Sequence, residues 1–325
     1  MRSRVVGTGS AVPDRVLNNH DLEKMVDTTD EWITTRTGIK ERRIASSDDF
    51  TSTLATRAAL NALDMAGIEP AELDMIIVAT VTPDYPFPST AALLQNNIKA
   101  VNASAFDISA ACSGFVYAAS IVDKFIKSGT VKNALVVGSE ILSRIVDWSD
   151  RNSCLLFGDG AGAVVLQADN GNSGILDTFM MSDGSNWDLL YQPAPGNRNP
   201  ASYKVVDERL AFIRMQGNEV FKLAVRAMED AAIKALAAGH MTPADVDLFI
   251  PHQANRRIID AIGKRLGIPA EKVYVNIERF GNTSSASIPI ALDEANRKGL
   301  IKPDNILLLD AFGGGMAWGA VTIRW

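Results

Sequence analysis

Apolar residues recur at helical spacing in the stretch that follows residue 107. No charged residue stands between Asp107 and Asp123. One side of the pattern carries Phe115, Val116, Ala119, Val122 and Ile126, and the other side carries Ile121 and Phe125. A helix that is apolar on all sides is an interior helix. The preceding segment, ASAFDI, is a short apolar strand pattern. The sequence therefore predicts a strand that turns into a buried helix near Cys112.

A second transition from strand to helix is predicted near residue 252. The apolar run DLFIP ends at His252, and QANRRIIDAIGKRLG follows it. Ile258, Ile259, Ile262 and Leu266 fall on one side of that segment, which predicts an amphipathic helix. His252 is therefore expected at the carboxyl end of a strand, where open α/β sheets bind their ligands.

The two halves of the chain resemble each other at three points in the same order. GIEPAELDMIIVAT is similar to GHMTPADVDLFIPH, and FGDGAGAVVL is similar to FGGGMAWGAVTI. Between them, AFDISAACSG aligns loosely with YVNIERFGNTSS, which sets Cys112 opposite Asn282. We therefore predict two layered α/β halves, residues 1–170 and 171–325, whose strand ends meet at a common centre.

Composition and charge argue against several classes of protein. The formal net charge of −6 makes nucleic acid an unsuitable partner. The chain has no run of about 18 apolar residues for a membrane span, and MRSRVVGTGSAVP lacks the apolar centre of a signal peptide. Two cysteines provide no disulfide framework, and no CxxC or HExxH spacing suggests a metal. We therefore expect a cytoplasmic protein without metal, with Cys154 in a core strand.

Cys112 is the candidate nucleophile. Unpaired backbone N–H groups and the positive end of the helix dipole lie at a helix start, and both favour a thiolate. A dipole contribution of about 1 kcal/mol shifts a pKa by less than about one unit, so a base or an electrophilic pocket is still needed. Free cysteine is also among the most buried residue types. Position alone therefore leaves a purely structural role open.

Six segments together resemble the thiolase-like condensing enzymes, and in detail the β-ketoacyl-acyl-carrier-protein synthase III family. They are DTTDEWITTRTGI, DISAACSGF, FGDGAGA, PHQAN, GNTSSASIP and AFGGGMAWG, and the similarity covers essentially the whole chain. The resemblance implies a thiolase-like five-layer αβαβα fold with two pseudo-symmetric halves, each built on a mixed, mostly parallel sheet. It makes Cys112 the acyl acceptor, His252 and Asn282 the decarboxylation pair, and the backbone N–H groups of Cys112 and Gly314 the oxyanion hole.

The implied reaction needs no cofactor, since acyl-CoA is a substrate. Cys112 would accept an acyl group from acyl-CoA, and malonyl-acyl carrier protein would then lose CO₂. The His252 Nε2–H and the Asn282 amide would hold the enolate while it attacks the acyl group. The product is the β-ketoacyl-acyl carrier protein that initiates type II fatty-acid synthesis. A condensing enzyme of a secondary-metabolite pathway and a degenerate acyl-CoA-binding protein stay open, whereas a papain-like hydrolase lacks any matching motif.

The resemblance also implies surfaces for substrates and partners. Trp32 and Arg151 would sandwich the CoA adenine, and the rest of the CoA channel would be lined by Arg36, Gly217, Phe221, Asn255 and Arg257. A basic cluster would dock the acidic carrier protein, and its residues are Lys222, Arg256, Arg257, Lys264 and Arg265. Phe87, in PDYPFPST, would close the acyl pocket of the partner subunit in a homodimer. Met316 and the segment SNWDLLYQPAPGNRNPAS depart from the commoner family pattern near that pocket.

Overall fold

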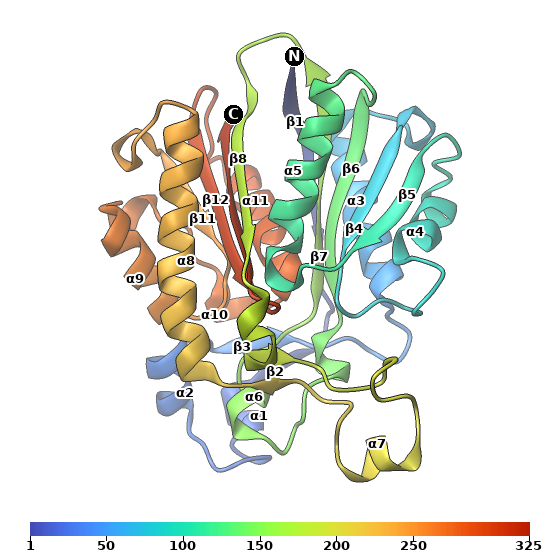
Figure 1. The fold of residues 1–325 in the computed structure, drawn as a ribbon, viewed down its shortest axis with the longest axis vertical. Coiled ribbons are helices and arrows are strands. Elements are labelled where there is room, and N and C mark those ends of the chain that lie inside the picture. Colours follow the sequence, from blue (N-terminus) through green and yellow to red (C-terminus); the bar gives the residue numbers. More distant parts are fainter.

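Two sheets form the frame of the computed structural model, which describes residues 1–325 (Figure 1). The first sheet has the strand order β1-β7-β6-β4-β5. Strands β5, β4 and β6 are parallel, and the pairs β6-β7 and β7-β1 are antiparallel. The strands are β1 (Arg2–Ala11), β4 (Met75–Ala79), β5 (Ser104–Ile108), β6 (Asn133–Glu140) and β7 (Gly160–Asp169).

The second sheet repeats this pattern with the order β11-β12-β13-β8. Its strands are β8 (Gly174–Ser182), β11 (Leu248–Pro251), β12 (Ile306–Gly313) and β13 (Ala317–Arg324). The pair β11-β12 is parallel, and the next two pairs are antiparallel. Where the first sheet has β5, the second has a single parallel bridge between Phe249 and Val273. Both sheets are therefore mixed, as the resemblance implies, but neither is mostly parallel in its pairing, because the β7 and β13 strands each add two antiparallel pairs.

Three layers of helices alternate with the two sheets. The outer face of the first sheet packs against α3 (Thr51–Ala66) and α4 (Thr90–Ile98). The outer face of the second packs against α8 (Gly217–Ala238) and α9 (Arg256–Leu266). Between the sheets lie α5 (Gly114–Lys127) and α11 (Ser287–Arg297). The predicted αβαβα layering is confirmed.

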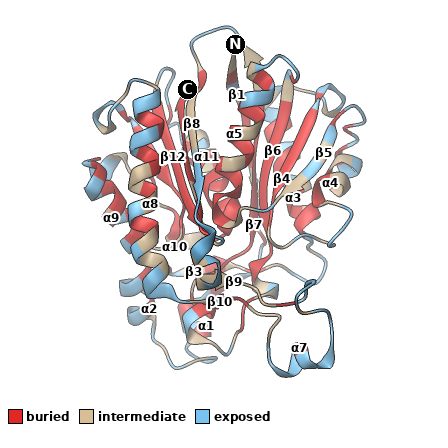
Figure 2. Cartoon of the chain, viewed as in Figure 1, coloured by how far each residue is buried: buried red, intermediate tan, exposed pale blue.

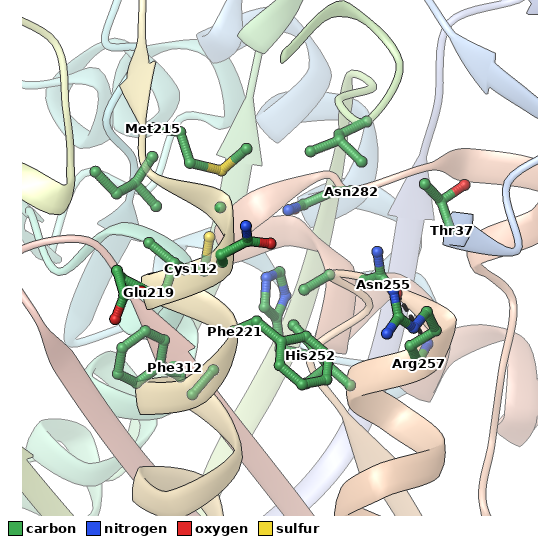
Figure 3. Close-up of a pocket in the computed structure, with 18 of the residues that line it drawn as sticks. Thr37, Cys112, Met215, Glu219, Phe221, His252, Asn255, Arg257, Asn282 and Phe312 are labelled. Atoms are coloured by element: carbon green, nitrogen blue, oxygen red, sulfur yellow. Dashed lines mark hydrogen bonds between the residues drawn. The ribbon is translucent and has the colours of Figure 1, made fainter. Parts of the chain in front are cut away.

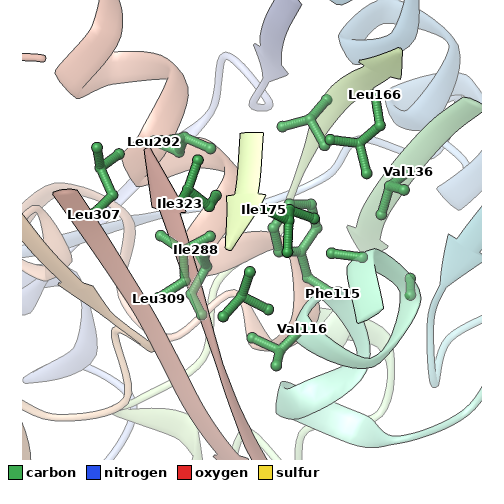
Figure 4. Close-up of a cluster of buried hydrophobic side chains, with 14 of the residues drawn as sticks. Phe115, Val116, Val136, Leu166, Ile175, Ile288, Leu292, Leu307, Leu309 and Ile323 are labelled. Atoms are coloured by element: carbon green, nitrogen blue, oxygen red, sulfur yellow. The ribbon is translucent and has the colours of Figure 1, made fainter. Parts of the chain in front are cut away.

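The central layer holds the largest apolar core (Figures 2 and 4). Phe115 and Val116 of α5 and Ile288 and Leu292 of α11 are buried there. Side chains from both sheets meet them, including Val136, Leu166, Leu307, Leu309 and Ile323. Full burial of a side chain of this size contributes about 1.5–3 kcal/mol. This core fixes the starts of both central helices relative to the ends of the strands.

The segments GIEPAELDMIIVAT and GHMTPADVDLFIPH occupy equivalent positions. Asp74 precedes β4, and its N–H donates to the carbonyl of Asn133 at 2.9 Å. Asp247 precedes β11, and its N–H donates to the carbonyl of Ile306 at 2.8 Å. Each carboxylate accepts the N–H of that same neighbour. The repeated aspartate therefore joins a pair of neighbouring parallel strands in each half, β4 to β6 and β11 to β12.

Each central helix follows a tight 3-10 turn, η2 (Ala111–Ser113) before α5 and η7 (Ser284–Ala286) before α11. The first residue of each turn has a positive φ, 45° in η2 and 50° in η7. Cys112 therefore matches Ser285. The predicted pairing of Cys112 with Asn282 is wrong by three residues, because the second half inserts the helix α10 (Ile277–Phe280) before its turn.

Smaller elements cover the carboxyl ends of the strands or connect the layers (Figure 1). They are β2 (Val16–Asn18), β3 (Glu41–Arg43), β9 (Leu190–Tyr191), β10 (Arg214–Met215), α1 (Asn19–Leu22), α2 (Asp30–Thr37), α6 (Arg151–Cys154), α7 (Tyr203–Asp207), η1 (Pro70–Glu72), η3 (Leu142–Arg144), η4 (Gly184–Leu189), η5 (Pro243–Asp245) and η6 (Ala270–Lys272). Cys154 lies in the short helix α6 and not in a strand, but it is buried in an apolar cluster. None of the helices has the length and apolar character needed to cross a membrane.

Candidate active site

A cavity of about 830 Å³ leads from the ends of α2, α8 and α9 to the centre of the molecule (Figure 3). Cys112, His252 and Asn282 lie at its inner end, and each comes from a different element. The walls also include several residues predicted from the sequence, namely Trp32, Arg36, Gly217, Phe221, Lys222, Asn255 and Arg257. The structure thus brings most of the predicted residues to one cavity.

Cys112 is held in the η2 turn against the end of β12. Its side chain is buried, with 8% of the residue exposed. A methyl group on Gly313 would come within 2.6 Å of the Cys112 backbone nitrogen, so the close approach of β12 requires glycine there. Burial raises the pKa of the Cys112 thiol to about 12, although a hydrogen bond with Ser284 lowers it in part. The resting residue is therefore a thiol.

His252 directly follows β11, as predicted, and is 2% exposed. Its Nδ1 lies 2.6 Å from the hydroxyl of Ser287, which also accepts the N–H of Gln253 at 3.3 Å. A Ser287 hydroxyl that donates to Nδ1 satisfies all three groups and leaves the ring proton on Nε2. Burial lowers the pKa of His252 to about 3. The ring is therefore neutral, and Nε2–H can donate.

Hydrogen bonds to the backbone and to the side-chain carbonyl of Asn282 hold this residue in place. Its N–H donates to Leu156 at 2.8 Å, and its carbonyl accepts from Gly158 at 3.0 Å. The side-chain Oδ1 accepts the N–H of Ser284 at 2.8 Å. The amide NH₂ is left for the cavity. The preceding residue, Gly281, has φ +63°, and a Cβ there would lie 2.8 Å from the Leu156 carbonyl. Glycine is therefore required at this bend.

A smaller cavity of about 300 Å³ extends from Cys112 in another direction. Gly314 lines it together with Cys112, so both residues predicted for the oxyanion hole border this cavity. Mostly apolar residues form the rest, including Leu142, Ile145, Leu190, Tyr191 and Ile213. The segment that follows Ser185 therefore contributes to this cavity. Met316 does not line it and instead packs in the core beside α8.

The predicted adenine site lies at the outer end of the large cavity. The Thr29 hydroxyl caps α2 by accepting the N–H of Trp32 at 3.1 Å. The guanidinium carbon of Arg151 lies 4.2 Å from the centre of the Trp32 ring, and that of Arg36 lies 5.4 Å from it. Arg151 itself does not line the cavity. The two expected faces of the sandwich thus contact each other directly, and a base would have to enter between them.

The predicted basic cluster is partly neutralised by its own neighbours. Lys222 pairs with Glu219 at 2.8 Å, Arg256 with Asp260 at 2.7 Å, and Arg265 with Glu229 at 2.6 Å. Lys264 forms no ion pair, and Arg257 lies over the ring of Phe221 at 5.5 Å. Within this cluster, Lys264 and Arg257 are therefore the cations without an acidic partner, but only Arg257 lines the cavity, whereas Lys264 lines a separate hollow beside α9.

Phe87 lines neither of the two cavities at Cys112 and is 86% exposed. Its neighbour Tyr85 is exposed as well. The sequence predicts that Phe87 meets a partner subunit, and its exposure in a single chain agrees with that arrangement.

Some groups at the site were missed by sequence reasoning. Ser287 orients His252, Ser284 fixes the Asn282 amide and interacts with the thiol, and Glu140 lies near Cys112. The segment GNTSSASIP contains both serines, but its serines read as small residues that permit close packing. Their hydrogen bonds depend on the turn before α11, which the sequence pattern did not define.

Comparison with known proteins identifies similar chains. The family profile described as 3-oxoacyl-[acyl-carrier-protein (ACP)] synthase III matches residues 106–184, and the profile of its C-terminal region matches residues 236–325. A β-ketoacyl-[acyl-carrier-protein] synthase III of Caldanaerobacter subterraneus is 54% identical over 321 residues, which are 99% of this chain and 97% of the relative. The relative of the same name from Aquifex aeolicus is 53% identical over the full length of both chains.

The fold is also similar to solved structures. The crystal structure of 3-oxoacyl-[acyl-carrier-protein] synthase III from Aquifex aeolicus matches with a TM-score of 0.93 at 52% identity. The match covers 99% of this chain and 100% of that one. The similarity in sequence and in layered fold therefore covers the whole length of these proteins.

Proposed function

The chain belongs to the 3-oxoacyl-[acyl-carrier-protein] synthase III family and is an initiating condensing enzyme of fatty-acid synthesis, and we propose that Cys112 is the residue that carries the acyl group. The observation that supports this role is the meeting of Cys112, His252 and Asn282 at the inner end of one cavity. The acyl donor is acyl-CoA, and the extender is malonyl-acyl carrier protein.

In the loading step, the Cys112 sulfur attacks the thioester carbonyl of acyl-CoA. The carbonyl oxygen becomes negative and is held by the backbone N–H groups of Cys112 and Gly314. The bond from carbon to the CoA sulfur then breaks, and the Cys112 proton ends on CoA. Because the proton leaves with CoA, the buried site gains no net charge. This matters for a thiol whose pKa is raised by burial.

In the condensation step, the malonyl group loses CO₂ and leaves an enolate. The His252 Nε2–H and the Asn282 NH₂ both donate to the enolate oxygen. The enolate carbon attacks the acyl group on Cys112, and the bond to the cysteine sulfur breaks. One proton from solvent restores the thiol. Two neutral donors suit this step because neither must lose or gain a proton while CO₂ departs.

The test is an incubation with a panel of acyl-CoA thioesters, followed by the intact mass of the protein. We expect one acyl group per chain, on the peptide that contains Cys112, and its release as β-ketoacyl-acyl carrier protein once malonyl-acyl carrier protein is added. The mass that accumulates fastest names the primer. Binding of acyl-CoA without an acyl-enzyme would instead favour a degenerate binding protein.

We propose that the carrier protein docks over α9, through Arg257 at the cavity and Lys264 further along the same helix, since these cations have no acidic partner. Lys264→Glu is expected to raise KM for malonyl-acyl carrier protein about tenfold, with acyl-CoA loading unchanged. The effect should shrink as salt is added. Steady-state kinetics with both substrates would measure it.

Lys302→Glu is the matched control for charge reversal. Lys302 precedes β12, whereas the site lies at the opposite end of that strand. This variant should leave both substrates unaffected. An equal loss of loading and condensation in Lys264→Glu would argue against a docking role. Arg265→Glu should have a smaller effect, because Glu229 already compensates Arg265.

The enzyme is proposed to be a homodimer in which Phe87 closes the partner's acyl cavity. The exposure of Phe87 and Tyr85 supports this, because large apolar side chains gathered at a surface mark contact sites. β5 is also an edge strand, and its outer edge is unpaired in the single chain. Sedimentation of a monomer at assay concentration would contradict the proposed dimer.

We propose that the protein is located in the cytoplasm, because two free cysteines suit a reducing compartment.

A further inference from the structure

Glu140 is the last residue of β6 and is fully buried. It forms no ion pair with any lysine, arginine or histidine, and burial raises the pKa of its carboxyl. It lies close enough to Cys112 for a charge on Glu140 to raise the pKa of the thiol. Because this buried acid has no cation beside it and lies next to the acyl acceptor, its protonation state affects the site.

One carboxyl oxygen of Glu140 receives several donors. The Val81 N–H lies 3.1 Å from Oε2, the Thr82 hydroxyl 2.7 Å and the Thr80 hydroxyl 3.2 Å. Thr82 accepts the N–H of Ile141, and the Thr80 hydroxyl accepts the Thr82 N–H, so both hydroxyl protons are free to point at Glu140. Oε2 is therefore an acceptor only.

The other oxygen, Oε1, lies 3.0 Å from the hydroxyl of Ser285. The same hydroxyl lies 2.8 Å from the carbonyl of Ala79. A serine hydroxyl has one proton, and a carbonyl can only accept. Both contacts become hydrogen bonds if the Ser285 proton goes to Ala79 and Oε1 carries a proton that it donates to Ser285. With a charged Glu140, the single Ser285 proton could serve only one of these two acceptors, and the other contact would not be a hydrogen bond.

We propose that Glu140 is a neutral carboxylic acid that positions the η7 turn, which follows Asn282 and packs against the turn of Cys112, with its proton on Oε1 donated to Ser285. Ser285 follows the positive-φ residue of η7, so it is the counterpart of Cys112 in the second half. A methyl group on Gly138 of β6 would lie 2.3 Å from the Ser285 carbonyl. Glu140 and its strand β6 thus both contact the turn that immediately follows Asn282.

Neutrality serves the reaction proposed for Cys112, on which this inference rests. Each time the enolate attacks, the cysteine sulfur leaves with negative charge. A carboxylate nearby would oppose that charge in a buried site, whereas a carboxylic acid does not. Other titratable groups do not replace this role. Asp84 of the 80–84 loop is turned to the N–H and hydroxyl of Ser52, and the β7 residue paired with Glu140 is Gly160.

The test compares Glu140→Gln with Glu140→Leu. Glutamine copies the neutral acid, because its NH₂ can donate to Ser285 and its oxygen can accept the three donors. We expect condensation within about threefold of wild type and an unchanged pH profile of Cys112 alkylation by iodoacetamide. Leucine keeps the bulk but no hydrogen bond, and should slow condensation about 30-fold or more by displacing the η7 turn beside Asn282 and Cys112.

A charged Glu140 would give the opposite result. Its loss in Glu140→Gln would lower the apparent pKa of the thiol by about one unit, which raises alkylation about tenfold near neutral pH. That outcome, or wild-type condensation in Glu140→Leu, would overturn the proposal. If the leucine variant does not fold, the infrared spectrum of wild type minus Glu140→Gln decides. A carboxylic-acid carbonyl band at neutral pH supports neutrality, and its absence contradicts it.

Asp123→Asn is the matched control. Asp123 is a fully buried acid toward the other end of α5, but it is paired with Lys127 at 2.9 Å. Its replacement should leave the alkylation profile unchanged and remove no carboxylic-acid band. Alkylation and infrared spectra do not depend on turnover, so they report on Glu140 even if Cys112 proves not to carry the acyl group.

Discussion

Cys112→Ala is expected to abolish both acyl transfer from acyl-CoA and condensation. The sulfur is the atom that forms the acyl bond, so its removal leaves no covalent intermediate, and the rate should fall by a factor of about 10⁴ or more. Cys112→Ser should fail as well, because a buried hydroxyl is harder to ionise than a thiol and a poorer leaving group. Intact mass after incubation with acyl-CoA, together with a condensation assay, measures both losses.

Cys154→Ser is the matched control, because it removes the only other cysteine. Cys154 is fully buried in the apolar cluster around α6 and is not among the residues that line either cavity at Cys112. It should load acyl groups as wild type does. Condensation that persists in Cys112→Ala would refute the assignment of the acyl acceptor. Loss of folding is excluded if the variant still binds acyl-CoA.

The sequence predicted the positions that end a strand or start a helix. Cys112 and His252 both follow apolar strands, and the helices after them have clear apolar patterns. A backbone position of this kind depends on residues close in the chain, so local periodicity reveals it. A layered α/β architecture also followed from the repeated halves, because each half must bury the same kinds of faces, whereas the five-layer arrangement was implied by the family resemblance.

Contacts between distant segments were not predictable in the same way. The tautomer of His252 depends on Ser287, which is 35 residues away, and Glu140 meets Ser285 across 145 residues. The ion pair of Arg265 with Glu229 joins two helices and removes a charge that the sequence counted as free. Such pairs depend on packing, and no spacing rule encodes them. The loose alignment at Asn282 failed for the same reason, since α10 is visible only in three dimensions.

Replacing His252 or Asn282 should separate the two half-reactions. Either change to alanine removes one of the two donors proposed for the enolate oxygen, and loss of one such donor typically costs about 10²–10³ in rate. Acyl loading uses the backbone N–H groups of Cys112 and Gly314, so it should stay within about tenfold of wild type. Single-turnover mass spectrometry for loading, and CO₂ release for condensation, would resolve the difference.

Asn282→Asp sharpens this comparison, because it keeps the shape and replaces the amide donor by an acid. At neutral pH an ionised carboxylate would repel the enolate, so decarboxylation should be slower than in Asn282→Ala.

The pH dependence of decarboxylation tests the protonation state of His252. Since burial lowers the pKa of His252 to about 3, its ring stays neutral above that range and its Nε2–H is retained. Protonation of His252 should therefore leave no step in the rate of malonyl decarboxylation between about pH 5 and pH 8. A step near the ordinary histidine pKa that disappears in His252→Ala would show that a charged imidazolium takes part, and the neutral two-donor mechanism would then be wrong.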